Sequence, residues 1–218
     1  MEMKHPLYSY VRTGMRGIFL LAFLIILASC DNSENNPVAK VDLIFQLQYD
    51  GEPLAGPNEV YELNDSVELQ FSKVSFYLSD FKLSDGSQTY PLWDVLHISF
   101  LQDINGDAIP ETQQKLTFEI PSGNYESLSF GLGLHPTLNN TTPSEHEVGS
   151  ALSFSSEYWP AWQSYIFEKI EGAYKVNGGQ LQSVALHVGG DDTYRVLEWS
   201  SGLSIDDGEV KVINIPID

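Results

Sequence analysis

Two of the four tryptophans in this chain, Trp159 and Trp162, lie three residues apart in an aromatic segment. Where a chain makes a helical turn, positions i and i+3 share a face, so the two indole rings can lie together. Indoles are electron-rich and easily oxidised, and a close pair suits a site for copper or heme-driven redox chemistry. The alternative is that both rings fill the core, because aromatic side chains supply much of a core's burial energy. The spacing alone leaves both interpretations open.

Histidine side chains are further candidate ligands, because imidazole nitrogen binds copper and zinc. The histidines beyond the N-terminal segment are His97, His135, His146 and His187. None is spaced as HxH or HxxxH, so a metal site has to be assembled by the fold. His187 ends an alternating strand pattern before two glycines, and His135 begins a loop after a similar pattern. Both positions can face a cleft, although a lone histidine is more often a structural or surface residue.

The other two histidines have more ordinary surroundings. His146 lies between Glu145 and Glu147 and is expected on a solvated surface. His97 lies inside the apolar segment 95–100, where burial and function fit the sequence equally well. A ligand role for His97 therefore stays open.

An acidic segment that begins at Asp103 resembles a calcium-binding loop. Asp103, Asn105, Asp107 and Glu111 place side-chain oxygens at loop positions 1, 3, 5 and 9. The glycine, however, falls at position 4 instead of 6, and position 12 is Gln114. An Asn-Gly hairpin turn with acidic flanks explains the same residues. Calcium is therefore a second candidate ligand.

Catalytic signatures are absent from the sequence. The chain has no GxSxG, HExxH or P-loop motif, and no GxGxxG ahead of a helical pattern. A hydrolase site built from two distant carboxylates is compatible with the sequence, but no nucleophile–base pair or metal motif points to one. We therefore predict that the protein is not an enzyme.

Residues 1–29 have the features of a bacterial lipoprotein signal peptide. Basic residues precede an apolar run that is too short to span a membrane comfortably. The run ends in Leu27-Ala28-Ser29-Cys30, which matches a lipobox and predicts cleavage before Cys30 and lipidation of its thiol. We therefore expect an outer-membrane lipoprotein that faces the periplasm or the cell surface.

Two consequences follow for the rest of the chain. Cys30 is the only cysteine, so the mature protein has no disulfide and depends on a packed core. Residues 30–40 are polar and contain Pro37, which predicts a flexible tether. Residues 41–218 then form one domain.

Acidic residues dominate the charge. The chain has 11 Lys and Arg against 30 Asp and Glu, and its formal net charge is −19. This balance argues against binding to nucleic acid and against adhesion to anionic lipid. It is compatible with cation binding, and equally with plain solubility.

Alternation of period two predicts an all-β domain. Val41, Leu43 and Phe45 alternate with other residues as in a half-buried strand. Similar patterns lie at 67–83, 116–120, 128–134, 166–170, 181–188, 194–199 and 210–217. The phase slips within 67–83, which indicates bulges or a change of sheet. We predict an antiparallel β-sandwich with long loops and one or two short helical turns, at 144–149 and 155–162.

Several of these segments together resemble the MbnP-like copper-binding domain. This family includes copper-repressible surface proteins of methane-oxidising bacteria and many Bacteroidetes lipoproteins. The segments that carry the resemblance are Phe76–Leu83, Gly123–Tyr125, Phe130–Leu134, Asn139, Trp159–Gly172 and Leu186–Gly190. The stretch Trp159–Gly172 is the most specific, because it is similar to the family's WSWQSGYKF…EG motif.

The resemblance implies a β-rich periplasmic or surface protein that binds copper in copper acquisition or homeostasis. In relatives, a tryptophan is oxidised to kynurenine by a diheme enzyme of the MauG type, and the product helps to hold copper beside a histidine. Carried over by position, Trp159 and Trp162 are the candidates for modification and His187 is the best candidate ligand. A MauG-like diheme peroxidase and a TonB-dependent outer-membrane receptor are the expected partners.

The chain departs from the family pattern in ways that bear on copper. Many relatives have a histidine in the segment that corresponds to 90–94, and none is present here. His97 or His135 is then expected to substitute. The competing prediction is a metal-free β-sandwich that binds a protein or a carbohydrate through an aromatic loop of Tyr158, Trp159 and Trp162.

Overall fold

The computed structural model describes residues 38–102 and 111–218. The predicted signal peptide, Cys30 and most of the predicted tether lie outside the described residues. So do Asp103, Asn105 and Asp107 of the predicted calcium loop. Within the described ranges, no helix has both the length and the apolar character needed to cross a membrane.

The first sheet is built around β1 (Val38–Tyr49). β1 pairs in parallel with β12 (Val210–Ile217) and antiparallel with β6 (Gln113–Pro121) and the short β2 (Glu52–Pro53). Val41, Leu43 and Phe45 are buried, as the alternation predicts. The strand begins at Val38, so the last residues of the predicted tether belong to the sheet.

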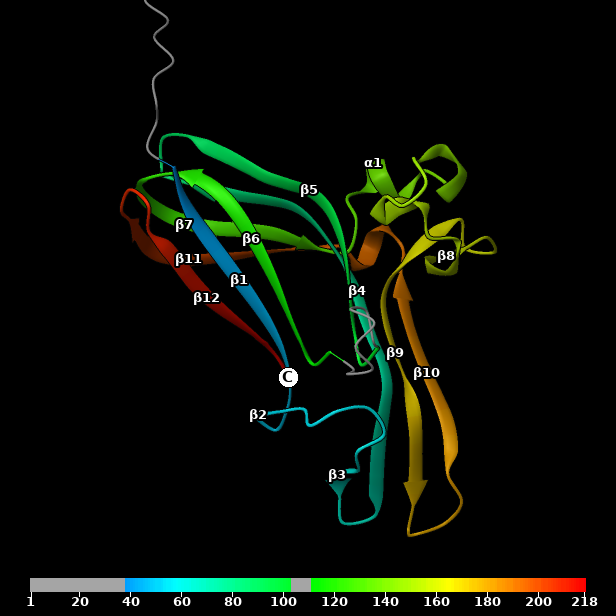
Figure 1. Ribbon diagram of the computed structural model, residues 1–218. Helices are drawn as coiled ribbons and strands as arrows, with labels where there is room; N and C mark the ends of the chain where they lie inside the picture. Colours follow the sequence, from blue (N-terminus) through cyan, green and yellow to red (C-terminus); the bar gives the residue numbers. More distant parts are fainter. Residues whose placement is uncertain (1–37, 103–110) are drawn as a thin grey trace, which may run out of the picture. The chain divides into compact units, whose positions relative to one another are not determined.

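The second sheet has the order β10-β9-β4-β7-β11, and β3, β5 and β8 pair with its members. Its strands are β3 (Tyr61–Asn64), β4 (Val67–Ser84), β5 (Thr89–Phe100), β7 (Gly123–Leu132), β8 (Tyr158–Trp159), β9 (Ser164–Val176), β10 (Gln182–Gly189) and β11 (Arg195–Ile205). Figure 1 shows β9 and β10 running beside the first half of β4.

The long strand β4 changes partners along its length. Its first half pairs with β9, and its second half pairs with β5 and β7. The register shifts between Phe71 and Lys73 and again near Asp80, which has a positive φ of 54°. These irregularities coincide with the phase slips in the sequence, so the prediction of bulges within 67–83 is confirmed.

The main core lies between the two sheets. Phe45 of β1 contacts Phe130 of β7, with ring centroids 6.1 Å apart, and Phe118 of β6 contacts Phe81 of β4 at 5.6 Å. Aromatic and aliphatic side chains from both sheets therefore interdigitate, as in other β-sandwiches. The predicted fold class, an all-β sandwich, is confirmed.

A layer of short elements covers the opposite face of the second sheet. It comprises α1 (Pro136–Asn139) and the 3-10 turns η1 (Pro143–Glu145), η2 (Ala151–Ser153) and η3 (Ser155–Glu157). A second apolar cluster lies beneath it and contains Tyr77, Leu134, Leu152, Tyr165 and Phe167. This layer, seen beside α1 and β8 in Figure 1, carries the candidate site.

Candidate functional site

The two tryptophans form a stacked pair on a tight turn. The Trp162 amide donates to the Trp159 carbonyl at 3.0 Å, which closes the turn between β8 and β9. The ring centroids are 4.5 Å apart and the ring planes differ by 11°. Trp159 is 38% exposed and Trp162 is 50% exposed. The rings therefore do not fill the core, and a redox or binding role for the pair stays a prediction.

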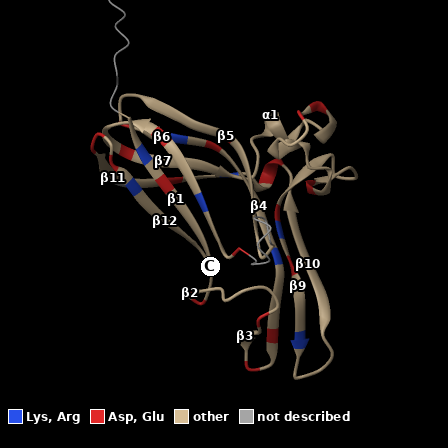
Figure 2. Cartoon of the chain, in the orientation of Figure 1, with Lys and Arg blue, Asp and Glu red and all other residues tan. Residues whose placement is uncertain are grey.

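His187 lies beside this stack. Its imidazole contacts the Trp159 indole edge to face, with centroids 6.0 Å apart and planes at 72°. The strand that carries it, β10, has no Lys, Arg, Asp or Glu (Figure 2). Three residues predicted from sequence thus come together at one place, from the aromatic turn and from the edge strand of the sheet.

Glu171 is a site residue that the sequence analysis did not identify. His187 lies directly opposite Lys169, and Glu171 is the next residue of β9 on the same face. Its Oε1 is 2.9 Å from Nε2 of His187. A carboxylate only accepts hydrogen bonds, so it favours the tautomer that carries the proton on Nε2. The lone pair on Nδ1 is then available to a metal, in the arrangement common for metal-binding histidines.

The space beside His187 is open to solvent. Trp162, Ser164, His187 and Thr193 are among the residues that line a pocket of about 430 Å³. A neighbouring pocket of about 500 Å³ shares Trp162 and Ser164, and Asp191 also lines it. A metal or a partner protein can therefore reach the imidazole and the indoles directly.

The two glycines after His187 let β10 end against the start of β9. A Cβ on Gly189 would lie 2.5 Å from the Tyr165 carbonyl oxygen, which no side chain tolerates. Gly190 has a φ of +92°, in the region that favours glycine. The Gly-Gly step therefore brings the His187 strand close to the residues that follow the tryptophan turn.

A buried asparagine ties these elements together. Asn139, only 3% exposed, accepts hydrogen bonds on Oδ1 from the Tyr165 amide (2.9 Å) and from the Ser164 hydroxyl (3.0 Å). Its amide group donates to Asp191 at 2.8 Å, and the Gly190 amide donates to the Ser164 hydroxyl at 3.0 Å. We call this network the Asn139 clamp. It fixes the start of β9, just after the tryptophan turn, against the end of the His187 strand.

A buried ion cluster lies on the same face of the sheet, under the segment that leads into β8. Glu157 is 2.9 Å from Nζ of Lys169, 3.3 Å from Nζ of Lys73 and 3.7 Å from Nε2 of His97. Burial raises the pKa of Glu157, but the close approach of His97 and of the Lys169 and Lys73 ammonium groups lowers it by more. The net effect holds that pKa well below its ordinary range. Because Trp159 follows two residues later, the cluster anchors the aromatic turn.

The neighbours of His97 are therefore residues of the buried layer, not Trp159. Its ring packs against Tyr77 at 4.9 Å and Phe154 at 5.7 Å, next to Glu157. These contacts give His97 a role in the buried cluster. Whether it also binds a metal stays a prediction.

His135 caps the short helix α1. Its Nδ1 accepts a hydrogen bond from the Thr137 amide at 3.3 Å, and its ring contacts Tyr194 at 5.9 Å. These contacts differ from those of His187, which faces Trp159 and Glu171. The structure thus supports His187 as the first ligand candidate, and a ligand role for His135 stays a prediction.

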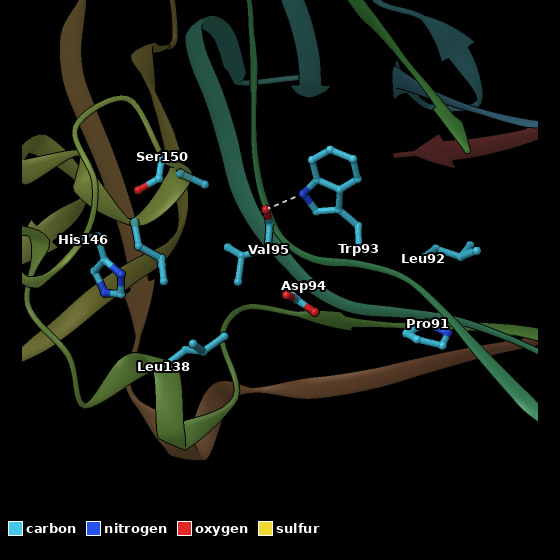
Figure 3. Close-up of a pocket in the computed structure, with 10 residues that line it drawn as sticks. Pro91, Leu92, Trp93, Asp94, Val95, Leu138, His146 and Ser150 are labelled. Carbon is cyan, nitrogen blue, oxygen red and sulfur yellow. Dashed lines mark hydrogen bonds between the residues drawn. The ribbon is translucent and has the colours of Figure 1, made fainter. Parts of the chain in front are cut away.

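His146 lines a separate open pocket of about 700 Å³. Its Nε2 is 2.7 Å from the Thr141 hydroxyl. Figure 3 shows His146, Leu138 and Val95 around this pocket, while the Trp93 indole donates to the Val95 carbonyl at 3.0 Å. Trp93 is 52% exposed and lies on β5, apart from the Trp159–Trp162 stack.

Within 38–102 and 111–218, no group of three or more His, Cys, Asp or Glu side chains is arranged to hold a metal ion. His187 and Glu171 supply one imidazole and one carboxylate. Among the described residues, no further His, Cys, Asp or Glu side chain joins them in such a group.

Comparison with protein families identifies the family of this chain. The family model described as MbnP matches residues 38–218. The fold is similar to the solved structure of MbnP from Methylosinus trichosporium, with 18% sequence identity and a TM-score of 0.47. That match covers 69% of this chain and 62% of the other chain, so it spans less than two thirds of the solved protein. No curated protein sequence matches this chain.

Proposed function

The chain belongs to the MbnP family, and we propose that it is a non-catalytic protein that binds copper at His187, beside the Trp159–Trp162 stack. The observation that carries the proposal is the meeting of His187 with the two indoles, since these groups come from strands separated in sequence. Imidazole nitrogen is a ligand for copper in both of its common oxidation states.

The residues present fit a copper ion when one further donor joins them. His187 offers Nδ1, and Glu171 orients the ring or supplies an oxygen. Nitrogen and oxygen donors suit Cu(II). A further donor is needed, and the resemblance to the family supplies a candidate: a kynurenine made from tryptophan has an amine and a ketone. Trp159 is the first choice for this modification because it contacts His187, and Trp162 is the second.

The same proposal includes a partner and a location. Exposed, stacked indoles are accessible to a diheme enzyme of the MauG type, which would use peroxide or dioxygen to open the pyrrole ring of an indole, with ring carbon C2 leaving as formate. A TonB-dependent receptor would accept the copper-loaded protein at the outer membrane. The lipobox at Cys30 supports anchoring of the chain in the cell envelope.

Copper titration of three proteins tests the assignment of His187. Calorimetry with Cu(I) and Cu(II) is run on the native protein, on His187→Ala and on the control His146→Ala, because His146 lines a separate pocket. We expect binding in the native protein and in the control, and loss of binding in His187→Ala. Equal affinity and stoichiometry in all three proteins would remove His187 from the site.

A second candidate function rests on the exposure of the stack. Trp159 and Trp162 present a flat aromatic surface to solvent, and such surfaces bind sugar rings or apolar side chains. Under this alternative, unmodified protein that has never met copper binds its partner fully. A glycan array probed with native protein and with Trp162→Ala separates the two functions, because the copper function predicts no glycan binding by either.

A further inference from the structure

A small apolar cavity lies between the two sheets of the sandwich. The copper proposal does not use it. Its volume is about 290 Å³. The side chains that form most of its wall are Phe45, Phe76, Leu78, Phe130, Leu132 and Ile215. They come from both sheets. Leu197 of β11, which also lines it, is 46% exposed, so the cavity opens to solvent beside β11.

One wall residue breaks the apolar pattern. Glu168 lies on β9 between Ile166, which is buried, and Ile170, which packs against the core between the sheets. Glu168 is half-buried and has no hydrogen-bond or ion-pair partner among the described residues. Burial raises the pKa of its carboxyl group. An unpaired carboxylate in an apolar wall is costly, and a cationic ligand would remove that cost.

The acidic residues in the cavity wall favour a cationic ligand. Among the residues that the structure describes, no Lys or Arg lines it, and the other titratable residue in its wall is Asp218. A ligand with a carboxylate head group would meet two acids, whereas an ammonium would meet its complement. The volume is at the small end of the range for ligand pockets, so it suits a short chain or one ring.

We propose that this cavity binds a small apolar amine, with the alkyl or aromatic part between the sheets and the ammonium group paired with Glu168. The site is separate from His187. Glu168 and Lys169 point to opposite faces of the sheet, and His187 shares the face of Lys169. The amine proposal and the copper proposal can therefore fail independently.

Three matched probes test the proposal by calorimetry on the full chain: octylammonium, octanol and octanoate. We expect octylammonium to bind best, octanol weakly and octanoate least. In Glu168→Gln, octylammonium should lose about tenfold or more in affinity, because a buried charge partner is removed. Octanol affinity should change little in the same variant. His187→Ala should bind octylammonium as the native protein does.

Two further measurements keep the test decisive. Leu132→Trp fills the cavity and should abolish binding of both octylammonium and octanol, and circular dichroism confirms that each variant is folded. Equal affinity for octylammonium and octanol, unchanged octylammonium binding in Glu168→Gln, or no binding of any probe would each overturn the proposal.

Discussion

The Trp159 indole and the His187 imidazole meet edge to face, with ring centroids 6.0 Å apart. One ring comes from the turn between β8 and β9, and the other from the end of edge strand β10. The Gly189-Gly190 step and the Asn139 clamp hold these two segments together. The proposed copper site therefore depends on residues that never touch the metal, and each can be tested separately.

Glu171 should tune copper binding through His187. In Glu171→Gln the side chain can donate as well as accept, so the proton of His187 is no longer held on Nε2. Loss of such an outer partner typically costs about 10- to 100-fold in metal affinity. Copper competition titrations measure the change, and nitrogen-15 NMR of the ring reports the tautomer.

The matched control for this prediction is Glu198→Gln, since Glu198 is an exposed glutamate on β11. We expect its copper affinity to equal that of the native protein. If Glu171→Gln keeps both native affinity and the Nε2–H tautomer, Glu171 does not orient the ligand.

Removing the Asn139 side chain should loosen the site and lower stability together. Asn139→Ala leaves the buried amide of Tyr165 and the hydroxyl of Ser164 without their shared acceptor. An unsatisfied buried polar group costs about 1–3 kcal/mol. Urea denaturation measures the loss, and copper affinity should fall as well. Asn140→Ala, at an exposed neighbouring position, should change stability by less than about 0.5 kcal/mol. An equal effect of both substitutions would argue against the clamp.

The Glu157 cluster should make the free energy of unfolding depend on pH in the acidic range. The pKa of Glu157 is lowered by folding, from an ordinary value of 4.5. Its contribution to stability is therefore complete above pH 4.5 and is lost as the pH falls toward the folded-state pKa. Glu157→Gln should destabilise the protein by about 3–5 kcal/mol near neutral pH, because Lys73 and Lys169 lose their counter-charge.

Thermal melts of the native protein and Glu157→Gln, taken from pH 7 to pH 3, check this prediction. The difference in melting temperature should shrink as the pH falls. Lys40→Gln, which removes an exposed pair with Glu119, is the control and should have little effect. A constant difference across the pH range would mean that Glu157 does not ionise differently on folding.

Much of the fold could be predicted because burial repeats every second residue. Val41, Leu43 and Phe45 were predicted to share the inner face of a strand, and all three are buried. β5 was not predicted as a whole, because Pro91 and the exposed Trp93 interrupt its alternation. Glu168 shows the limit of prediction from alternation. Its charge predicts a surface position, but it lies on the inward face of β9.

The site was predictable only in part. The aromatic motif and its family resemblance pointed to Trp159, Trp162 and His187, and the structure brings these three together. Glu171 is the glutamate of the motif's final Glu-Gly, but its pairing with His187 follows from the register of β9 against β10, which the motif does not give. Asn139 accepts a hydrogen bond from Tyr165, which is 26 residues away in the sequence, and no local sequence pattern predicts such a contact.

The most direct test of the copper proposal uses protein purified from the native host. Intact mass and peptide mapping are combined with copper quantification on the same sample. The proposal predicts an oxidised Trp159 or Trp162 and near-stoichiometric copper. Unmodified tryptophans together with no copper, even after loading with the metal, would contradict it and would turn the search toward glycan or protein partners of the aromatic stack.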